Sequence, residues 1–163
     1  MRTLVLYSSQ SGNTKKLADV IYGVLPNDKK IFSIDEAPEI LADIDLIALG
    51  FWFQGGKPDL KATRFLPQLN NKKIFLFVTH GAAKGSAHAQ QGMAAAIALA
   101  AGAKVIGTFS CQGEVSSQVI QTAAAKPEPP PWLQDAPSAI GHPNQNDCNE
   151  LRQEIAGILR SDE

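Results

Sequence analysis

Short apolar runs alternate along the chain with segments in which apolar residues recur every three or four positions. The runs are rich in Val, Ile, Leu and Phe and end in polar turns, which is typical of buried strands. They span residues 3–8, 30–33, 46–51, 73–79 and 104–111. The intervening and following segments predict helices over residues 14–25, 59–69, 86–101 and 146–160.

This alternation predicts an α/β fold built on a parallel sheet. Strands that are apolar at consecutive positions are buried on both faces, so helices must cover both sides of the sheet. We therefore expect a three-layer, doubly wound domain with five parallel strands, extending as a single unit over residues 1–163.

A proline-rich stretch interrupts the pattern before the last helix. Six of the ten prolines lie between Pro127 and Pro143, including three in a row at 129–131. This composition predicts an extended, polyproline-like excursion at about 126–145. A linker that returns the last helix to the sheet is the favoured interpretation. The alternative is a cover over a ligand site or a docking surface for a partner.

The composition narrows the class of protein. The 163 residues are 44% hydrophobic and 19% charged, which is typical of a folded chain. A net charge of −1 gives no strong field that would favour nucleic acid or an anionic membrane. Two distant cysteines, Cys111 and Cys148, fit a reducing compartment better than a disulfide framework or a zinc site. Because no signal peptide or membrane span is recognisable, the expected compartment is the cytoplasm.

The loop after the first strand has the composition of a phosphate site. Ligands of open α/β sheets bind outside the carboxyl ends of the strands, and SSQSGNTK at 8–15 leaves such an end and opens directly into a helix. Its backbone N–H groups can cradle a phosphate, Ser9, Ser11 and Thr14 add hydroxyl donors, and Gly12 permits close approach. An ordinary capped turn would use the same residue types. Neither a Gly-x-Gly-x-x-Gly motif nor a Walker A motif is present.

Three aromatic residues end the third strand. Because successive side chains of a strand alternate between faces, Phe51, Trp52 and Phe53 cannot all point into the core. At least one of them is expected to face a ligand or solvent, where it could stack on a flat ring beside the Gly55-Gly56 pair. The alternative is one core aromatic with two covering the surface.

Two further loops lie at the same edge. His80 follows the fourth strand in a loop of small residues, where it could touch a ligand or be an ordinary loop histidine. Cys111 ends the fifth strand, and a structural cysteine is favoured over a reactive thiol because no Cys-x5-Arg phosphatase loop surrounds it. The sequence contains no Ser/His/Asp set, paired carboxylates or metal-ligand spacing, so we assign no catalytic residue and no metal.

The segment Ser9-Gln10-Ser11-Gly12-Asn13-Thr14 resembles the phosphate loop of the flavodoxins, whose pattern is Thr/Ser-x-Thr/Ser-Gly-x-Thr. The aromatic loop and the small-residue loop are placed like the two loops that sandwich FMN in that family. The segments at 50–59 and 110–114 look more like a subgroup of flavodoxin-like proteins from anaerobic and gut-associated bacteria, one member of which works with a bilirubin reductase.

The resemblance implies the strand order 2-1-3-4-5 and FMN as cofactor. It implies that the loop from Ser9 to Thr14 holds the phosphate and that an aromatic of 51–53 lies against the isoalloxazine ring. Gly55 or Gly56 would give the backbone freedom to bond the flavin N5. The residues implied at the ring's polar edge and along the pocket wall are Thr79, His80, Gly81, Ala82, Cys111 and Gln112.

The function implied is an FMN-binding electron carrier that passes electrons between a reductase and a redox partner. The alternative is an FMN-dependent reductase, or a subunit of one, acting on a quinone-like or tetrapyrrole substrate. A phosphate-ligand binder without flavin is a third possibility. Low-potential flavodoxins are usually strongly acidic. The net charge of −1, and the placing of Lys84 where a cation would lie near the flavin, therefore argue against a low-potential carrier.

Overall fold

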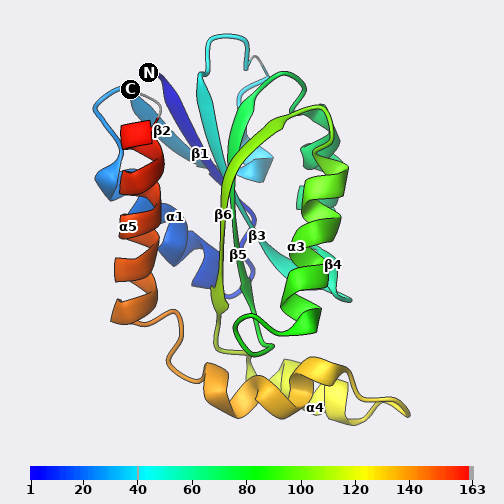
Figure 1. Ribbon diagram of the computed structural model, residues 1–163. Helices are drawn as coiled ribbons and strands as arrows, with labels where there is room; N and C mark the ends of the chain where they lie inside the picture. The colour runs from blue at the N-terminus through cyan, green and yellow to red at the C-terminus, as the bar shows by residue number, and fades with distance from the viewer. Residues whose placement is uncertain (40, 162–163) are drawn as a thin grey trace.

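The computed structural model describes residues 1–39 and 41–161, and it shows a sheet between two layers of helices (Figure 1). Five strands run parallel: β1 (Thr3–Tyr7), β2 (Lys29–Ser33), β3 (Leu46–Gln54), β5 (Lys73–His80) and β6 (Lys104–Gln112). Their order in the sheet is β2-β1-β3-β5-β6. This confirms the predicted order 2-1-3-4-5, because β4 lies off that path.

The sequence analysis missed the short strand β4 (Lys57–Pro58), which pairs antiparallel with the end of β3. Gly55 and Gly56 connect the two strands, and both have positive φ, at 61° and 77°. A two-residue turn of this kind follows the natural twist of a hairpin and favours glycine. The loop after the third predicted strand is therefore a hairpin, and β3 extends through all three aromatic residues.

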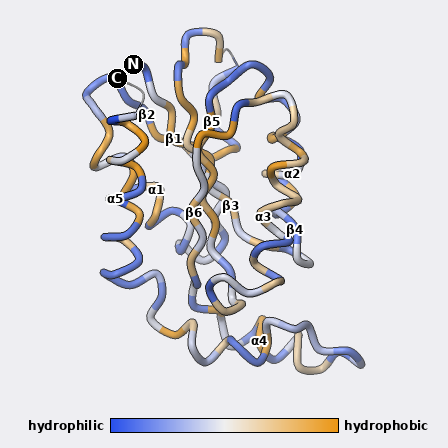
Figure 2. The backbone as a smooth tube through the Cα atoms, viewed as in Figure 1, coloured by the Kyte–Doolittle hydropathy of each residue, from blue (hydrophilic) through white to orange (hydrophobic). Residues whose placement is uncertain are grey.

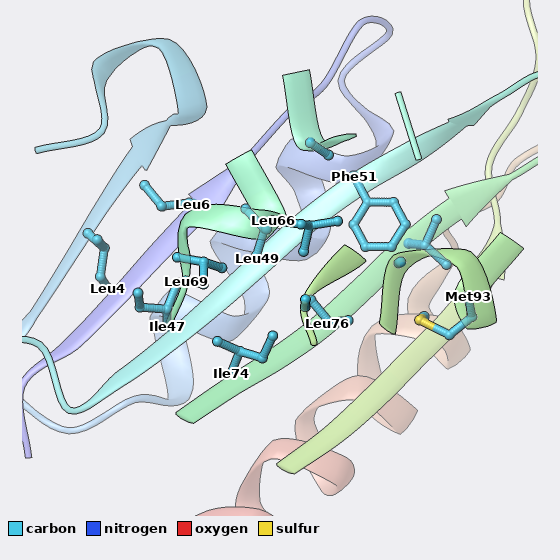
Figure 3. Close-up of a cluster of buried hydrophobic side chains, with 14 residues drawn as sticks. Leu4, Leu6, Ile47, Leu49, Phe51, Leu66, Leu69, Ile74, Leu76 and Met93 are labelled. Atoms are coloured by element: carbon cyan, nitrogen blue, oxygen red, sulfur yellow. The ribbon is translucent and has the colours of Figure 1, made fainter. Parts of the chain in front are cut away.

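The helices divide evenly between the two faces of the sheet. On one face, α1 (Asn13–Val24) and α5 (Gln145–Ser161) pack over a core that includes Val5, Ala48 and Phe77. On the other, α2 (Leu60–Phe65), the 3₁₀ turn Leu66–Gln68 and α3 (Ala87–Leu99) cover the cluster shown in Figure 3. Figure 2 shows the same layering as apolar colour concentrated along the central strands. Both faces of the strands are buried, as their continuous apolar sequence requires.

The excursion at 126–145 differs from its prediction. The structure has a helix α4 (Ser117–Ala124), which the sequence analysis did not predict, and a 3₁₀ helix η3 (Pro131–Ala139) where an extended chain was expected. Figure 1 shows this segment lying across the end of the sheet at which β5 and β6 finish. Leu133, Ala136 and Ala139 recur every third residue and are buried or half-buried. This spacing places them on one side of a 3₁₀ helix, so packing overrides the local proline composition.

Among the described residues, no helix is long and apolar enough to cross a membrane.

Candidate functional site

The carboxyl edge of the sheet brings three of the predicted loops into direct contact. The Thr14 hydroxyl at the start of α1 lies 2.9 Å from the Thr79 hydroxyl at the end of β5, and it also donates to the Phe51 carbonyl of β3 at 3.4 Å. The Ser8 amide donates to the Gly50 carbonyl at 2.9 Å. The phosphate loop is therefore tied to the two strands beside it.

The phosphate loop leaves backbone donors unpaired at the start of α1. Gly12 caps α1 in the left-handed region at φ 93°, and no side chain caps the helix. Within residues 1–39 and 41–161, no acceptor is recorded for the amides of Asn13, Thr14 and Lys15, because the first helical bond is from Lys16 N to Gly12 O. Open N–H groups at a helix start, beside the exposed Ser11, suit the oxygens of a phosphate.

Two side chains predicted to hold the phosphate are already engaged. The Thr14 hydroxyl is buried between β3 and β5, as described above, so Thr14 offers the loop its backbone N–H rather than its side chain. Asn13 donates through Nδ2 to the Glu114 carbonyl at 3.0 Å. Ser9 accepts from the Gly12 amide at 3.1 Å, while the side chains of Gln10 and Ser11 are exposed.

The three aromatic residues of β3 have different surroundings. Phe51 is fully buried in the core. Phe53 is stacked on His80, with ring centroids 5.3 Å apart, and its edge packs against Gly92 of α3. Trp52 lies between them and points to the opposite face, in register with Thr79, where α1 begins. Trp52 is partly exposed and is the aromatic of the three that is left for a ligand.

Asp59 is a site residue that the sequence analysis missed. It is 2% exposed and caps α2. Its carboxylate accepts from the Ser8 hydroxyl at 2.8 Å and from the Trp52 amide at 3.4 Å. It therefore joins the start of the phosphate loop to the aromatic strand. The Pro-Asp pair before a helix did signal a cap, but the contact with Ser8, 51 positions away, has no signature in the sequence.

His80 is a structural residue. Burial lowers its pKa to about 4, so the ring is neutral at neutral pH. Nδ1 lies 2.9 Å from the Ala82 carbonyl and must carry the proton, because a carbonyl only accepts. Nε2 then accepts from the Ser110 hydroxyl at 2.7 Å. With both nitrogens engaged, the ring is occupied in holding the loop after β5.

That loop nevertheless retains two open donors. In the described part of the chain, no acceptor is recorded for the amides of Gly81 and Ala82, whereas the Ala83 amide is bonded. These two amides are neighbours at the edge where β5 ends. Gly81 is half-buried, and Ala82 is 1% exposed.

Cys111 and Gln112 face inward rather than toward an open pocket. Cys111 is fully buried, and burial raises the pKa of its thiol far above the ordinary value, so it is an unreactive core residue. Gln112 donates to the Ser138 hydroxyl at 2.9 Å.

Lys84 lies in the loop after β5. It pairs with Glu150 of α5 and sits over the Phe109 ring. The charge of Lys84 therefore has a partner on α5.

A groove of about 600 Å³ runs between α1 and α5 and is lined partly by Lys15, Lys16 and Arg152. It shares Gly12 and Lys15 with the phosphate loop. The three loops at the carboxyl edge, rather than this groove, combine open amides with an available aromatic ring.

The comparisons with known proteins show the family and the fold. The flavodoxin domain model matches residues 4–156. The chain is 37% identical over 120 residues to the flavodoxin-like domain-containing protein BilS of Clostridioides difficile (strain CD3), covering 71% of this chain and 68% of that protein.

Solved structures show the same fold. A flavodoxin from Streptococcus pneumonia TIGR4 superposes with a TM-score of 0.66 at 13% identity, covering 99% of each chain. A flavoprotein from Lactobacillus acidophilus NCFM, solved in complex with FMN, superposes with a TM-score of 0.55 at 23% identity, covering 67% of this chain and 92% of that one. Taken with the matched residues, these findings show that the chain belongs to the flavodoxin domain family.

Proposed function

We propose that this protein binds FMN at the carboxyl edge of its sheet and transfers electrons between a reductase and a redox partner. The observation that carries the proposal is the set of open amides of Asn13, Thr14 and Lys15 at the start of α1, within a chain of the flavodoxin domain family. The L. acidophilus relative solved with FMN supports the choice of ligand.

The donor set of the phosphate loop fits a phosphate monoester. Backbone N–H groups and the positive end of the α1 dipole attract an anion without any lysine or arginine among residues 8–14. Ser9, Gln10 and Ser11 lie at the surface of that loop, and the left-handed Gly12 keeps its outer side free of a Cβ. Asn13 and Thr14 contribute their amides, because their side chains fix the loop to β3, β5 and Glu114.

The other two loops fit the ring system. Trp52 supplies a flat apolar surface, and the amides of Gly81 and Ala82 supply donors for a polar edge. The hairpin turn at Gly55-Gly56 supplies backbone without side chains at the end of the strand that carries Trp52. Bound FMN would supply the redox chemistry, while the protein binds it, orients it and excludes water.

Electron carriage is favoured over catalysis by the state of the nearby titratable groups. His80 is neutral with both ring nitrogens bonded, and the Cys111 thiol is buried and protonated. Neither is placed to exchange protons with a substrate. The two free, buried cysteines also agree with work in the cytoplasm, where thiols stay reduced.

The second candidate is an FMN-dependent reductase acting on a quinone-like or tetrapyrrole substrate. The segment 131–142 favours it, because this segment lies across the carboxyl edge, where it could form one wall of a substrate pocket. The test is NAD(P)H consumption. Direct oxidation of NAD(P)H by the isolated FMN-loaded protein supports the reductase, whereas reduction only through an added reductase supports the carrier.

FMN binding itself is tested with a charge placed in the phosphate loop. Ser11→Glu should weaken FMN binding by about 100-fold, because a carboxylate would repel the phosphate in a site with no cation. Asn27→Glu adds the same charge at an exposed loop at the other end of α1 and should leave the affinity unchanged. A wild-type protein that takes up no FMN would refute the proposal.

A further inference from the structure

The segment 131–142, called the strap below, is bonded to both halves of the candidate site. It consists of η3 and the three residues that follow it. At one end, the Asp135 carboxylate accepts from the Ala83 amide at 2.9 Å, and Trp132 packs over Gly81. Figure 1 shows the strap running below the ends of β5 and β6.

The other end of the strap reaches the phosphate loop through one intermediate residue. The Gly141 amide donates to the Glu114 carboxylate at 3.1 Å, and the Glu114 amide donates to the His142 carbonyl at 2.8 Å. The Glu114 carbonyl in turn accepts from the Asn13 side chain at 3.0 Å. A continuous chain of hydrogen bonds therefore joins the strap to the first residue of α1.

Trp132 fills the space that a side chain on Gly81 would need. A Cβ built on Gly81 would lie 3.2 Å from the Trp132 ring and 2.8 Å from Val115. The absence of a side chain at Gly81 thus lets the strap come down onto the backbone of the loop. In the middle of the strap, Ser138 accepts from Gln112, whose amide group also lies 3.5 Å from the Gly81 carbonyl.

Two other contacts hold the same loop: His80 Nδ1 donates to the Ala82 carbonyl at 2.9 Å, and Lys84 pairs with Glu150. Residues 81–85 are Gly-Ala-Ala-Lys-Gly, and small side chains make few contacts of their own. Ordering such a backbone costs about 1–2 kcal/mol per residue. Asp135 accepts a hydrogen bond from the Ala83 amide alone, and no acceptor is recorded in the described chain for the neighbouring amides of Gly81 and Ala82. A carboxylate acceptor placed here holds the loop without covering these two donors.

We propose that Asp135 is a positioning residue for the FMN site. Through the Ala83 amide it fixes the loop after β5, so that the Gly81 and Ala82 amides are aligned before the ring system binds. The inference rests on the proposed function, and it assigns the outlying proline-rich segment to the cofactor site. Preorganisation of this kind increases affinity because less conformational entropy is lost on binding.

The test compares Asp135→Ala, Asp135→Asn and Glu128→Ala. Glu128 is an exposed acid three residues before the strap, for which the described chain records no side-chain bond, so its variant removes the same charge away from the site. FMN and riboflavin dissociation constants are measured for each protein, together with the visible circular dichroism of the bound flavin. Because the loop is expected to contact the ring and not the phosphate, Asp135→Ala should weaken both ligands alike, by about 10-fold, the scale of one hydrogen bond to a charged group.

Asp135→Asn should retain most of the affinity, because its amide oxygen still accepts from Ala83, and Glu128→Ala should match the wild type. Unchanged FMN binding by a folded Asp135→Ala would overturn the inference. Tighter FMN binding would also overturn it, because it would mean that the strap competes with FMN for the site. If Asp135→Ala does not fold, the FMN and riboflavin dissociation constants of Trp132→Leu are the test, and both flavins are expected to bind more weakly. If the wild type binds FMN and these variants bind flavins with wild-type affinity, the inference is refuted and the proposed function is not. A wild type that binds no FMN refutes the proposed function and the inference with it.

Discussion

The two halves of the carboxyl edge differ in whether their polar groups have hydrogen-bond partners within the protein. At the start of α1, the amides of Asn13, Thr14 and Lys15 have no acceptor within the described chain, and Ser11 is exposed. At the end of β5, the ring of His80 and the amide of Ala83 are bonded to other parts of the protein. The first half is suited to receiving a ligand, whereas most of the second is committed to holding its own shape.

The same contrast appears within three residues of β3. Phe51 is fully buried and the half-buried Phe53 stacks on His80 beside α3, while the half-buried Trp52 faces the start of α1. Alternation along a strand thus assigns neighbouring aromatics to stability and to binding. The contrast makes each side chain testable by two separate measurements, unfolding and flavin affinity.

The largest expected effect is the loss of stability on replacing Phe53, and the matching replacement of Trp52 should instead affect mainly the affinity for FMN. Phe53→Ala should lower the free energy of unfolding by about 3–4 kcal/mol, because it empties the space between His80 and Gly92. Trp52→Ala should cost about 1 kcal/mol of stability and yet weaken FMN binding about 10-fold. Urea unfolding of the FMN-free proteins and FMN titration measure the two effects. Equal loss of affinity in both variants would remove the distinction between the two faces.

The stability of the protein should fall at acidic pH because His80, at the end of β5, is buried in its neutral form. His80 titrates near 6.5 in the unfolded chain and at about 4 in the folded one, so the unfolded state binds more protons between these values. Stability from this group is complete above about pH 6.5 and is lost as the pH falls toward 4, by about 3 kcal/mol in all.

Unfolding by urea at pH 7.5 and at pH 4.5 measures this loss, and His80→Asn should flatten the difference between the two pH values. If the variant kept the full pH dependence of the wild type, the buried, neutral ring would not be its source.

Asp59 joins the two halves, and its loss should lower stability less than the loss of Phe53 or the titration of His80. Asp59→Ala removes the cap of α2 and the acceptor of the Ser8 hydroxyl, which together should lower the free energy of unfolding by about 2 kcal/mol. FMN affinity should fall as well, because the phosphate loop and Trp52 lose their common support. Asp59→Asn keeps one acceptor oxygen, so its stability and FMN affinity should lie between those of Asp59→Ala and the wild type. Wild-type affinity in a measurably destabilised Asp59→Ala would mean that Asp59 is a helix cap and nothing more.

The fold was predictable because its signals are local. The five apolar runs gave the parallel strands, and glycines and prolines marked the helix ends. The 3₁₀ helix η3 was not predicted, since proline composition outweighed the three-residue spacing of Leu133, Ala136 and Ala139. That spacing was the signal that would have revealed it.

The candidate site was predictable only where its residues adjoin in sequence. The Ser-Gly loop and the aromatic triplet each reveal themselves within a few positions. The roles of Thr14, Asp59 and His80 depend on partners 30 to 65 positions away, brought close by the order of the strands. No pattern in the chain announces such contacts before the sheet is assembled.

The central claim is that the start of α1 binds the phosphate of FMN, and the ratio of riboflavin to FMN dissociation constants tests it most directly. Riboflavin has the ring system and lacks the phosphate. The account predicts that the wild type prefers FMN by at least about 100-fold, the scale of two or more hydrogen bonds to a charged group. It also predicts that Ser11→Glu abolishes this preference by weakening FMN alone. Equal affinities for both flavins in the wild type would contradict the account.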